Sequence, residues 1–224
     1  MKKIDLENWC RKEHYLYYTN SLNVEVNMTA NIDVTDLLDF CHTNGYKFYP
    51  TLIYCVTKVL NRIDNFRMFK DKNGDLCVWD HLVPNYTIFH EEDHTFSDCW
   101  TDFTDDFGSF YKNITYDMEL GKMKRGIKVK SGQPANFYCV SCTPWTTFTA
   151  VSSRVVNGGP AFFPIITAGK YDETKQMPVN ITIAHAVADG YHIGLFFESL
   201  QKEVSMECLE SYLSSIVKLN PIEK

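Results

Sequence analysis

The pattern of apolar and polar positions near the C-terminal end predicts a strand that is followed directly by a helix. The apolar side of this strand is formed by every second residue: Val179, Ile181, Ile183 and His185. Alternation with a period of two is typical of a strand that buries one face. Asp189 and Gly190 suit a turn and a helix start, and apolar residues then recur at helical spacing from Ile193 to Val204. A histidine is therefore predicted at a corner between a strand and a helix.

The same periodicities predict an α+β fold for the rest of the chain. Strands are expected at residues 24–32, 86–89, 137–142, 147–156 and 162–168. Helices are expected at residues 33–44, 50–63 and 100–114. Asn73-Gly74 between two apolar runs predicts a β-hairpin in which both turn residues have positive φ, and the polar, basic residues 116–136 predict a mobile loop. Because strands and helices are interspersed, we expect a single domain over residues 1–224, with a large mixed sheet covered by helices.

Composition and charge narrow the range of partners. The 224 residues are 45% hydrophobic and 14% aromatic, which is sufficient for a packed core. The formal net charge of −6 argues against a nucleic-acid-binding protein, whose contact surface would be basic. The chain has no apolar run of membrane-spanning length, and no apolar signal segment follows the basic start. We therefore expect a cytoplasmic protein with neither a nucleic acid nor a membrane as its partner.

The eight cysteines are expected to be reduced thiols. Most of them lie within apolar stretches, as buried cysteines do. The motif Cys139-x-x-Cys142 is compatible with half of a zinc site or with a redox pair, but no second C-x-x-C or H-x-H motif is near it. No metal is therefore expected.

His185 and Asp189 form an H-x-x-x-D-G pattern that has two interpretations. A histidine on an apolar face is most often a hydrogen-bonded core residue, and an aspartate before a glycine is most often a turn or cap residue. Alternatively, His185 is a general base, because imidazole titrates near neutral pH. On the pattern alone, the structural interpretation is favoured.

Six segments of the chain resemble motifs of one enzyme family. In chain order they are NWCRKEHYLYY, GYKFYPTLIY, VPNYTIFHEEDHTFSDCW, VSCTPW, FFPIITAGKY and AHAVADGYHIGLFFESLQ. Each resembles a motif of the chloramphenicol acetyltransferase family, and the order is the family's order. The resemblance implies a coenzyme A dependent O-acetyltransferase with acetyl-CoA as co-substrate and chloramphenicol as the default acceptor. It also implies a two-layer sandwich that assembles as a homotrimer with active sites at subunit interfaces.

The resemblance also implies roles for individual residues. His185 matches the catalytic base, which deprotonates the acceptor hydroxyl in a ternary complex without an acyl-enzyme. Ser141 matches the hydroxyl donor to the oxyanion, where one donor is worth about 3 kcal/mol. Asp189 matches a residue that pairs with an arginine, here Arg11, and supports the site instead of orienting the imidazole as in a triad. Three positions match the coenzyme A side: Thr167, Lys170 and Tyr171.

Six positions match the acceptor pocket of the family: Tyr18, Phe96, Ser97, Cys139, Val151 and Ser153. Cys139 stands where asparagine is common, and Ala184 precedes the base where a second histidine is common. Val151 and Ser153 lie in the run TTFTAVSSRVV, where the family commonly has bulky apolar residues. Loss of this apolar wall predicts weaker binding of chloramphenicol.

Other functions remain as alternatives. The chain could acetylate a different small hydroxyl compound, or it could be a trimeric binding protein without turnover. Joint presence of His185, Ser141, Asp189 and Arg11 disfavours the second alternative. A dihydrolipoamide acyltransferase core also carries H-x-x-x-D-G, but we expect no room here for a lipoyl module and its linker. A Ser–His hydrolase is disfavoured because G-x-S-x-G does not surround Ser141.

Overall fold

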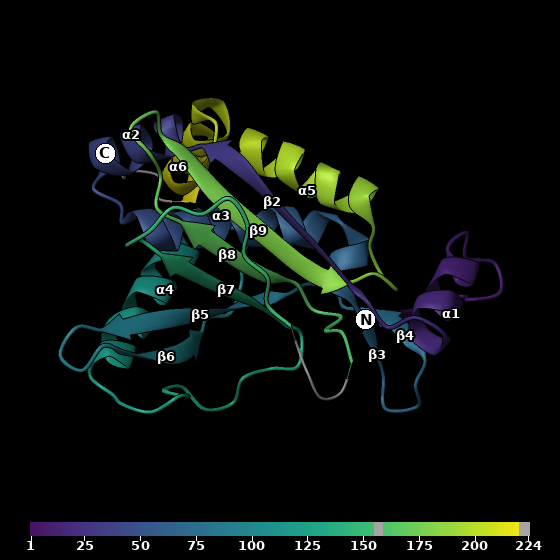
Figure 1. The fold of residues 1–224 in the computed structure, drawn as a ribbon. Coiled ribbons are helices and arrows are strands. Elements are labelled where there is room, and N and C mark those ends of the chain that lie inside the picture. The colour runs from purple at the N-terminus through teal and green to yellow at the C-terminus, as the bar shows by residue number, and fades with distance from the viewer. Residues whose placement is uncertain (155–158, 220–224) are drawn as a thin grey trace.

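A computed structural model describes residues 1–154 and 159–219 and contains a six-stranded mixed sheet in the order β2-β9-β8-β7-β5-β6 (Figure 1). The strands of this sheet are β2 (Glu25–Asp33), β5 (Val83–His90), β6 (Thr95–Trp100), β7 (Phe137–Thr143), β8 (Ile165–Gly169) and β9 (Gln176–Ala184). β7 runs parallel to β5 and β8, and the other neighbours are antiparallel. A smaller sheet has the order β1-β4-β3, with β1 (Lys2–Lys3), β3 (Met68–Lys70) and β4 (Leu76–Val78). The predicted α+β class is confirmed.

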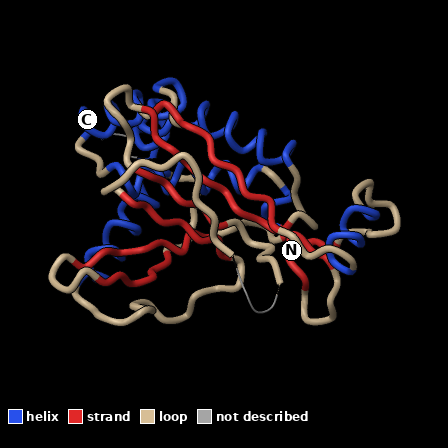
Figure 2. The backbone as a smooth tube through the Cα atoms, viewed as in Figure 1, coloured by secondary structure: helices blue, strands red, loops and turns tan. Residues whose placement is uncertain are grey.

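Most of the helices gather on one side of the large sheet, and α1 lies beyond one end of it (Figure 2). The helices are α1 (Lys12–Asn20), α2 (Thr35–Asn44), α3 (Phe48–Arg62), α4 (Phe107–Lys122), α5 (Gly190–Glu203), α6 (Met206–Leu219) and the short 3-10 helix η1 (Asp64–Arg67). α2 ends at Gly45, whose φ of 70° suits glycine, and α4 begins where the Asp106 carboxylate accepts a hydrogen bond from the Ser109 backbone. No helix within residues 1–154 and 159–219 is long and apolar enough to cross a membrane.

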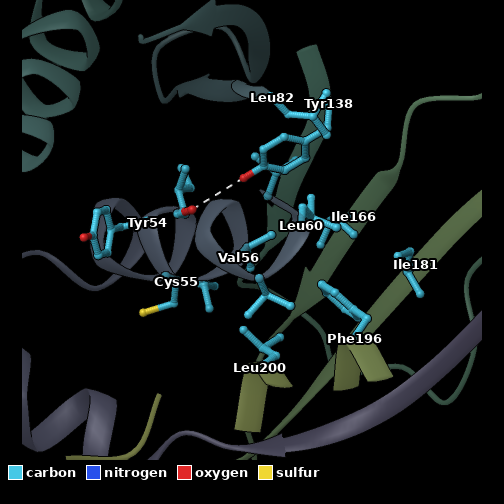
Figure 3. Packing of buried hydrophobic residues seen from close by; sticks show 14 of the residues in the cluster. Tyr54, Cys55, Val56, Leu60, Leu82, Tyr138, Ile166, Ile181, Phe196 and Leu200 are labelled. Carbon is cyan, nitrogen blue, oxygen red and sulfur yellow. Dashed lines mark hydrogen bonds between the residues drawn. The ribbon is translucent and has the colours of Figure 1, made fainter. Parts of the chain in front are cut away.

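The two faces of the sheet have different chemistry. Strand register aligns one row that is mainly apolar, formed by Met28, Ile181, Ile166, Val140 and Tyr86. Figure 3 shows Ile166 and Ile181 on the side of the sheet that packs against α3 and α5. The next row, which faces the other side, is largely polar and includes Thr29, Asn180, Thr167 and Ser141. The helices therefore cover the apolar face, and Ser141 and Thr167 lie on the opposite face.

Three predicted elements differ from the structure. Residues 147–154 form no strand, and the last two residues of that prediction lie outside the described residues. The helix predicted from Trp100 begins only at Phe107, because residues 95–100 alternate as a strand and pair with β5. The loop predicted from residue 116 begins after Lys122, since α4 continues and buries Met118. The patterns also did not predict β1, α1, η1, β6 or α6.

The predicted hairpin is present between β3 and β4, but its turn is longer than expected. Of the turn residues 71–75, only Gly74 has positive φ, at 83°. The Asp71 carboxylate accepts hydrogen bonds from the backbone nitrogens of Asn73 and Asp75, each at 2.9 Å. This side chain satisfies the backbone of a wider turn, so a two-residue turn is not formed.

Glu203 is a buried carboxylate that connects α5 with α3 and α6. Only 3% of its side chain is exposed. It accepts hydrogen bonds from Arg62 and from the Tyr212 hydroxyl, and the Lys58 ammonium lies 3.8 Å away. The charge is therefore compensated within the helix layer.

Glu203→Ala is expected to lower the free energy of unfolding by about 2–3 kcal/mol, because the two cations lose a buried partner. Glu198→Ala changes an exposed position of the same helix and is expected to stay within about 0.5 kcal/mol of the wild type. Urea unfolding at one fixed protein concentration measures both variants. Equal stability of the two variants would contradict the role given to Glu203.

Candidate active site

His185 is the first residue after β9, and its imidazole is held in one tautomer. The ring nitrogen Nδ1 lies 3.0 Å from the Ala188 carbonyl oxygen. A carbonyl oxygen can only accept a hydrogen bond, so Nδ1 carries the hydrogen, and in the neutral ring Nε2 therefore keeps its lone pair. The Tyr18 ring stacks on the imidazole, with 3.9 Å between ring centroids and 20° between planes. The side chain therefore has the state and the support that a general base requires.

The turn that follows His185 presents this carbonyl oxygen. The backbone nitrogens of Val187 and Ala188 both donate to the Ala184 carbonyl oxygen, at 3.1 and 3.3 Å. Asn65 donates to the Val187 carbonyl oxygen at 2.7 Å, and the side chains from Ala186 to Ala188 are buried. Small apolar side chains let the turn fold tightly against the core. The sequence AVA between the histidine and the aspartate is therefore what positions the hydrogen-bond acceptor.

Asp189 pairs with Arg11, as the sequence analysis predicted, and it caps α5. Its Oδ2 accepts a hydrogen bond from Arg11, and the other terminal nitrogen of Arg11 lies 3.4 Å from the His185 carbonyl oxygen. Burial favours the protonated form of Asp189, but the charge of Arg11 and the contact with His192 outweigh it and lower the pKa of the carboxyl. Because Ala188 occupies Nδ1 of the imidazole, the aspartate acts on the backbone of the base and not on its ring.

Ser141 does not lie near His185 within one chain. Ser141 is in register with Thr167, and Thr167 is in register with Asn180. Strands are about 4.8 Å apart and rise about 3.3 Å per residue, so two strand spacings and five residues separate Ser141 from His185 by roughly 20 Å. No side chain spans that distance. A single chain thus keeps the predicted base and the predicted oxyanion donor apart.

The three residues predicted for the coenzyme A side lie on β8 and just after it. Thr167 is 8% exposed and is the register neighbour of Ser141. The backbone nitrogen of Lys170 donates to the Thr146 carbonyl oxygen at 2.9 Å. The Tyr171 ring is partly exposed and lies 6.3 Å from the Phe48 ring. Because β8 and β9 are antiparallel, these residues lie toward the end of the sheet that is remote from His185.

The structure separates Phe96 from Ser97, although the motif resemblance predicts that both line one pocket. Phe96 is 51% exposed and pairs in register with Phe89. Ser97 points to the other face of the sheet and is fully buried. Its hydroxyl contacts Nε2 of His90 at 2.8 Å and donates to the Gly126 carbonyl oxygen at 2.6 Å. Ser97 thus anchors the loop after α4, and its hydroxyl is occupied.

The remaining predicted acceptor residues are Cys139, Val151 and Ser153. Cys139 lies two residues before Ser141 on β7, so both side chains project from the same face. Burial raises the pKa of the Cys139 thiol to about 11, which makes it a neutral apolar group at neutral pH. Val151 and Ser153 are partly buried in the irregular segment between β7 and β8.

A cavity of about 420 Å³ adjoins the strand end that carries the base. Its walls include Tyr18, Lys70, Phe162, Ala184 and Ala186. Lys70 and Phe162 were not predicted, because nothing in the local sequence connects the β3 hairpin with the end of β9. His192 was also missed, although its place three residues after the cap residue Asp189 matches the spacing of a capping box. Among the residues that the structure describes, no group of three or more His, Cys, Asp and Glu could hold a metal ion.

Comparison with known proteins agrees with the residue-level resemblance. Residues 1–201 match the family described as chloramphenicol acetyltransferase. A chloramphenicol acetyltransferase of Clostridium perfringens is 40% identical over 205 residues, which span 90% of this chain and 94% of that protein. The chloramphenicol acetyltransferase of Campylobacter coli is 38% identical over 202 residues, with 89% and 96% covered.

Solved structures show the same fold. A chloramphenicol acetyltransferase structure aligns with a TM-score of 0.79 at 24% identity and covers 92% of this chain and 100% of that chain. The dihydrolipoamide acetyltransferase of Azotobacter vinelandii aligns with a TM-score of 0.65 at 14% identity, covering 90% and 88%. At these identities, each structural likeness concerns the fold alone.

The contact between Arg11 and Asp189 predicts a coupling between the two side chains. Arg11→Ala and Asp189→Asn are each expected to destabilise the protein, and the double variant should be little worse than the worse single variant. An interaction energy of about 1 kcal/mol or more is expected near pH 7 from urea unfolding of all four proteins. Because the pair lowers the pKa of Asp189, this coupling should fade as the pH falls through the carboxyl range. Strictly additive effects near pH 7 would contradict the pairing.

Proposed function

Because the chain belongs to the chloramphenicol acetyltransferase family, we propose that it transfers an acetyl group from acetyl-CoA to a hydroxyl of chloramphenicol. The observation that carries the proposal is the imidazole of His185, whose Nδ1 is occupied by the Ala188 carbonyl oxygen and whose Nε2 is left as the basic nitrogen. The three residues Asp189, Arg11 and Tyr18 support this side chain. We further propose the cytoplasm as its location, where eight free cysteines stay reduced.

The proposed reaction is a direct transfer in a ternary complex. Nε2 of His185 takes the proton of the acceptor hydroxyl as the hydroxyl oxygen attacks the thioester carbonyl carbon. The Ser141 hydroxyl donates a hydrogen bond to the oxyanion that forms on that carbonyl. The carbon–sulfur bond then breaks, and the proton passes from the imidazolium to the leaving coenzyme A thiolate. The products are the acetyl ester and coenzyme A, so no acyl-enzyme is required.

The proposed active site is built by two chains. Ser141 and His185 are roughly 20 Å apart along the sheet of one chain, which is too far for both to contact one thioester. A second copy can supply the missing group, and a ring of three copies repeats the same contact three times. We therefore propose a homotrimer in which each site takes His185 from one chain and Ser141 from its neighbour.

We assign the proposed contacts with the two substrates to separate sets of residues. Coenzyme A is assigned to Thr167, Lys170 and Tyr171, which follow Ser141 toward the carboxyl ends of β7 and β8. The acceptor is assigned to five positions: Tyr18, Phe96, Cys139, Val151 and Ser153. Ser97 is left out, because its hydroxyl is buried and already bonded on the helix side of the sheet.

A different small hydroxyl compound remains the second candidate acceptor. The observation that favours it is the segment 147–154, which has no strand and carries Val151 and Ser153, where the motif resemblance leads us to expect bulky apolar groups. The reaction would be the same, and only the compound that donates the hydroxyl would differ.

His185→Ala is expected to leave the protein folded and to abolish acetyl transfer, because no other base replaces the imidazole. Ser141→Ala is expected to lower kcat roughly 100-fold, the loss that is typical of one oxyanion donor. Release of the coenzyme A thiol from acetyl-CoA measures both, with circular dichroism as the control for folding. Near wild-type turnover of His185→Ala would contradict the mechanism.

Mixed trimers test whether the site is shared. Equal amounts of His185→Ala and Ser141→Ala chains, refolded together, should recover about a quarter of the wild-type activity, because random assembly gives that fraction of intact sites. Each variant refolded alone is the control. If base and donor belonged to the same chain, no intact site would form and the mixture would stay as inactive as the controls.

The altered wall predicts a raised KM for chloramphenicol. Losing some tens of Å² of apolar contact costs about 1–2 kcal/mol, which is a roughly five- to thirtyfold weaker affinity. Val151→Phe combined with Ser153→Leu should lower KM more than it changes kcat, whereas Ser152→Leu, at an exposed neighbouring position, should change neither. Initial rates over a range of chloramphenicol concentrations measure this. An unmodified protein that binds chloramphenicol as tightly as its relatives would contradict the prediction.

A further inference from the structure

His192 contacts the cap residue of its own helix through one ring nitrogen. Nδ1 lies 2.9 Å from Oδ1 of Asp189 and 3.3 Å from the Asp189 backbone nitrogen. The contact with the Asp189 backbone nitrogen belongs to a capping box at the start of α5, in which the Asp189 side chain in turn accepts from the His192 backbone. Only 14% of the His192 side chain is exposed. The usual residue at this position is Glu or Gln, which accepts a hydrogen bond from the cap residue. A histidine at this position can therefore do what Glu and a deprotonated cap cannot: it can donate a hydrogen bond to the Asp189 carboxylate.

The shorter contact indicates that His192 acts as a donor. A bare ring nitrogen at 2.9 Å from a carboxylate oxygen would be repelled by it, so we infer that Nδ1 carries a hydrogen and donates to Oδ1. A protonated Nδ1 cannot also accept from the Asp189 backbone N–H, so the longer approach of 3.3 Å is then a contact without a hydrogen bond. A glutamate in this place would bring a second negative charge beside Asp189. Histidine instead adds a hydrogen-bond donor to the carboxylate.

The Asp189 carboxylate is thus held from two sides. Oδ1 accepts from His192 and from the Tyr191 backbone nitrogen at 3.1 Å, and Oδ2 accepts from Arg11. Arg11 in turn reaches the carbonyl oxygen of His185 at 3.4 Å. A chain of contacts therefore runs from His192 through Asp189 and Arg11 to the backbone of the proposed base.

These linked contacts are important because the Asp189 carboxylate could otherwise adopt a second orientation. About a third of the Asp189 side chain is exposed, so without a donor on Oδ1 the carboxylate can turn toward water. Nε of Arg11 is buried without a hydrogen-bond partner, so the guanidinium depends on Asp189 for its charge compensation. Release of the carboxylate would free Arg11 and, with it, the His185 carbonyl.

We propose that His192 is a positioning residue for acetyl transfer: it fixes the carboxylate of Asp189 in the orientation that pairs with Arg11 and thereby holds the backbone of His185. This inference rests on the proposed function, since His185 must be the base for its position to affect the rate. Among the described residues, the ionisable groups that face Asp189 and His192 include Arg11 and Tyr191, whose ring centroid lies 5.6 Å from that of the imidazole.

Three substitutions separate positioning from capping. His192→Ala removes both contacts and is expected to lower kcat about tenfold, with KM for acetyl-CoA and for chloramphenicol within about twofold of the wild type. His192→Gln can donate to Oδ1 and accept from the Asp189 backbone, so it should restore kcat to within about twofold. His192→Glu can cap but repels Asp189, so its kcat should be as low as that of the alanine variant or lower.

Asp106→Ala is the matched control. It removes the side-chain cap of α4, where Ser109 donates to Asp106 at 2.8 Å, and it lies outside the proposed site. Loss of a cap at either helix should lower Tm by about 2–4 °C. Only His192→Ala and His192→Glu, which lack the hydrogen-bond donor to Asp189, should also have a lower kcat.

Three outcomes would overturn the proposal. They are an unchanged kcat in His192→Ala, a glutamine variant as slow as the alanine variant, and an equal loss of kcat in Asp106→Ala. A wild-type protein without any acetyl transfer would refute the proposed function instead. In that case the changes in Tm of His192→Ala, Arg11→Ala and the double variant still test the linked contacts from His192 through Asp189 to Arg11. A double variant that is no less stable than the worse single variant supports these contacts, and additive changes in Tm overturn them.

Discussion

The pairing of β9 with β2 on one side and β8 on the other is the constraint on which the core and the proposed site both depend. A slip by one residue would turn Ile181 toward the polar face and Asn180 into the helix layer. Both faces resist such a slip. The apolar face packs on α3 and α5, and on the polar face the Asn180 amide donates to Asn27 at 2.9 Å and to the Thr29 hydroxyl at 3.0 Å. Because the register is held in this way, His185 emerges at a defined point at the end of the strand.

The same strand register is the reason why the proposed acetyl transfer requires more than one chain. Ser141 lies on the polar face near the middle of the sheet, and His185 lies at one end of it, so the sheet that positions each group also keeps them apart. A second chain on the polar face would bring the two kinds of group together. In the proposed trimer, an active site therefore exists only where two subunits are in contact. If the trimer dissociates at low protomer concentration, turnover should fall with it.

The five residues from His185 to Asp189 divide the support of the base between two neighbours. The Ala188 carbonyl sets the tautomer of the ring, and the Asp189 carboxylate acts through Arg11 on the backbone. A triad would place both tasks on the aspartate. Separation of the two tasks leaves the carboxylate available to cap α5 and to contact His192. Of the four departures that the motif resemblance indicates, Cys139, Val151 and Ser153 lie in the region that we assign to the acceptor, and Ala184 directly precedes the base.

Periodicity in the sequence determined the fold class, the strand that ends at His185 and the helix that begins after Asp189. It could do so because the apolar and polar pattern of neighbouring residues shows which face of a strand or helix is buried. The resemblance of short motifs determined the family and the pairing of Arg11 with Asp189, although these residues are far apart in the chain. Tertiary structure decided the rest. Trp100 belongs to a strand because β5 pairs with it, and Ser97 is unavailable because His90 and Gly126 reach it from other segments. The distance between Ser141 and His185 follows from the strand order β9-β8-β7, which no local pattern encodes. These features arise from contacts between remote segments, and such contacts are established only when the whole sheet has formed.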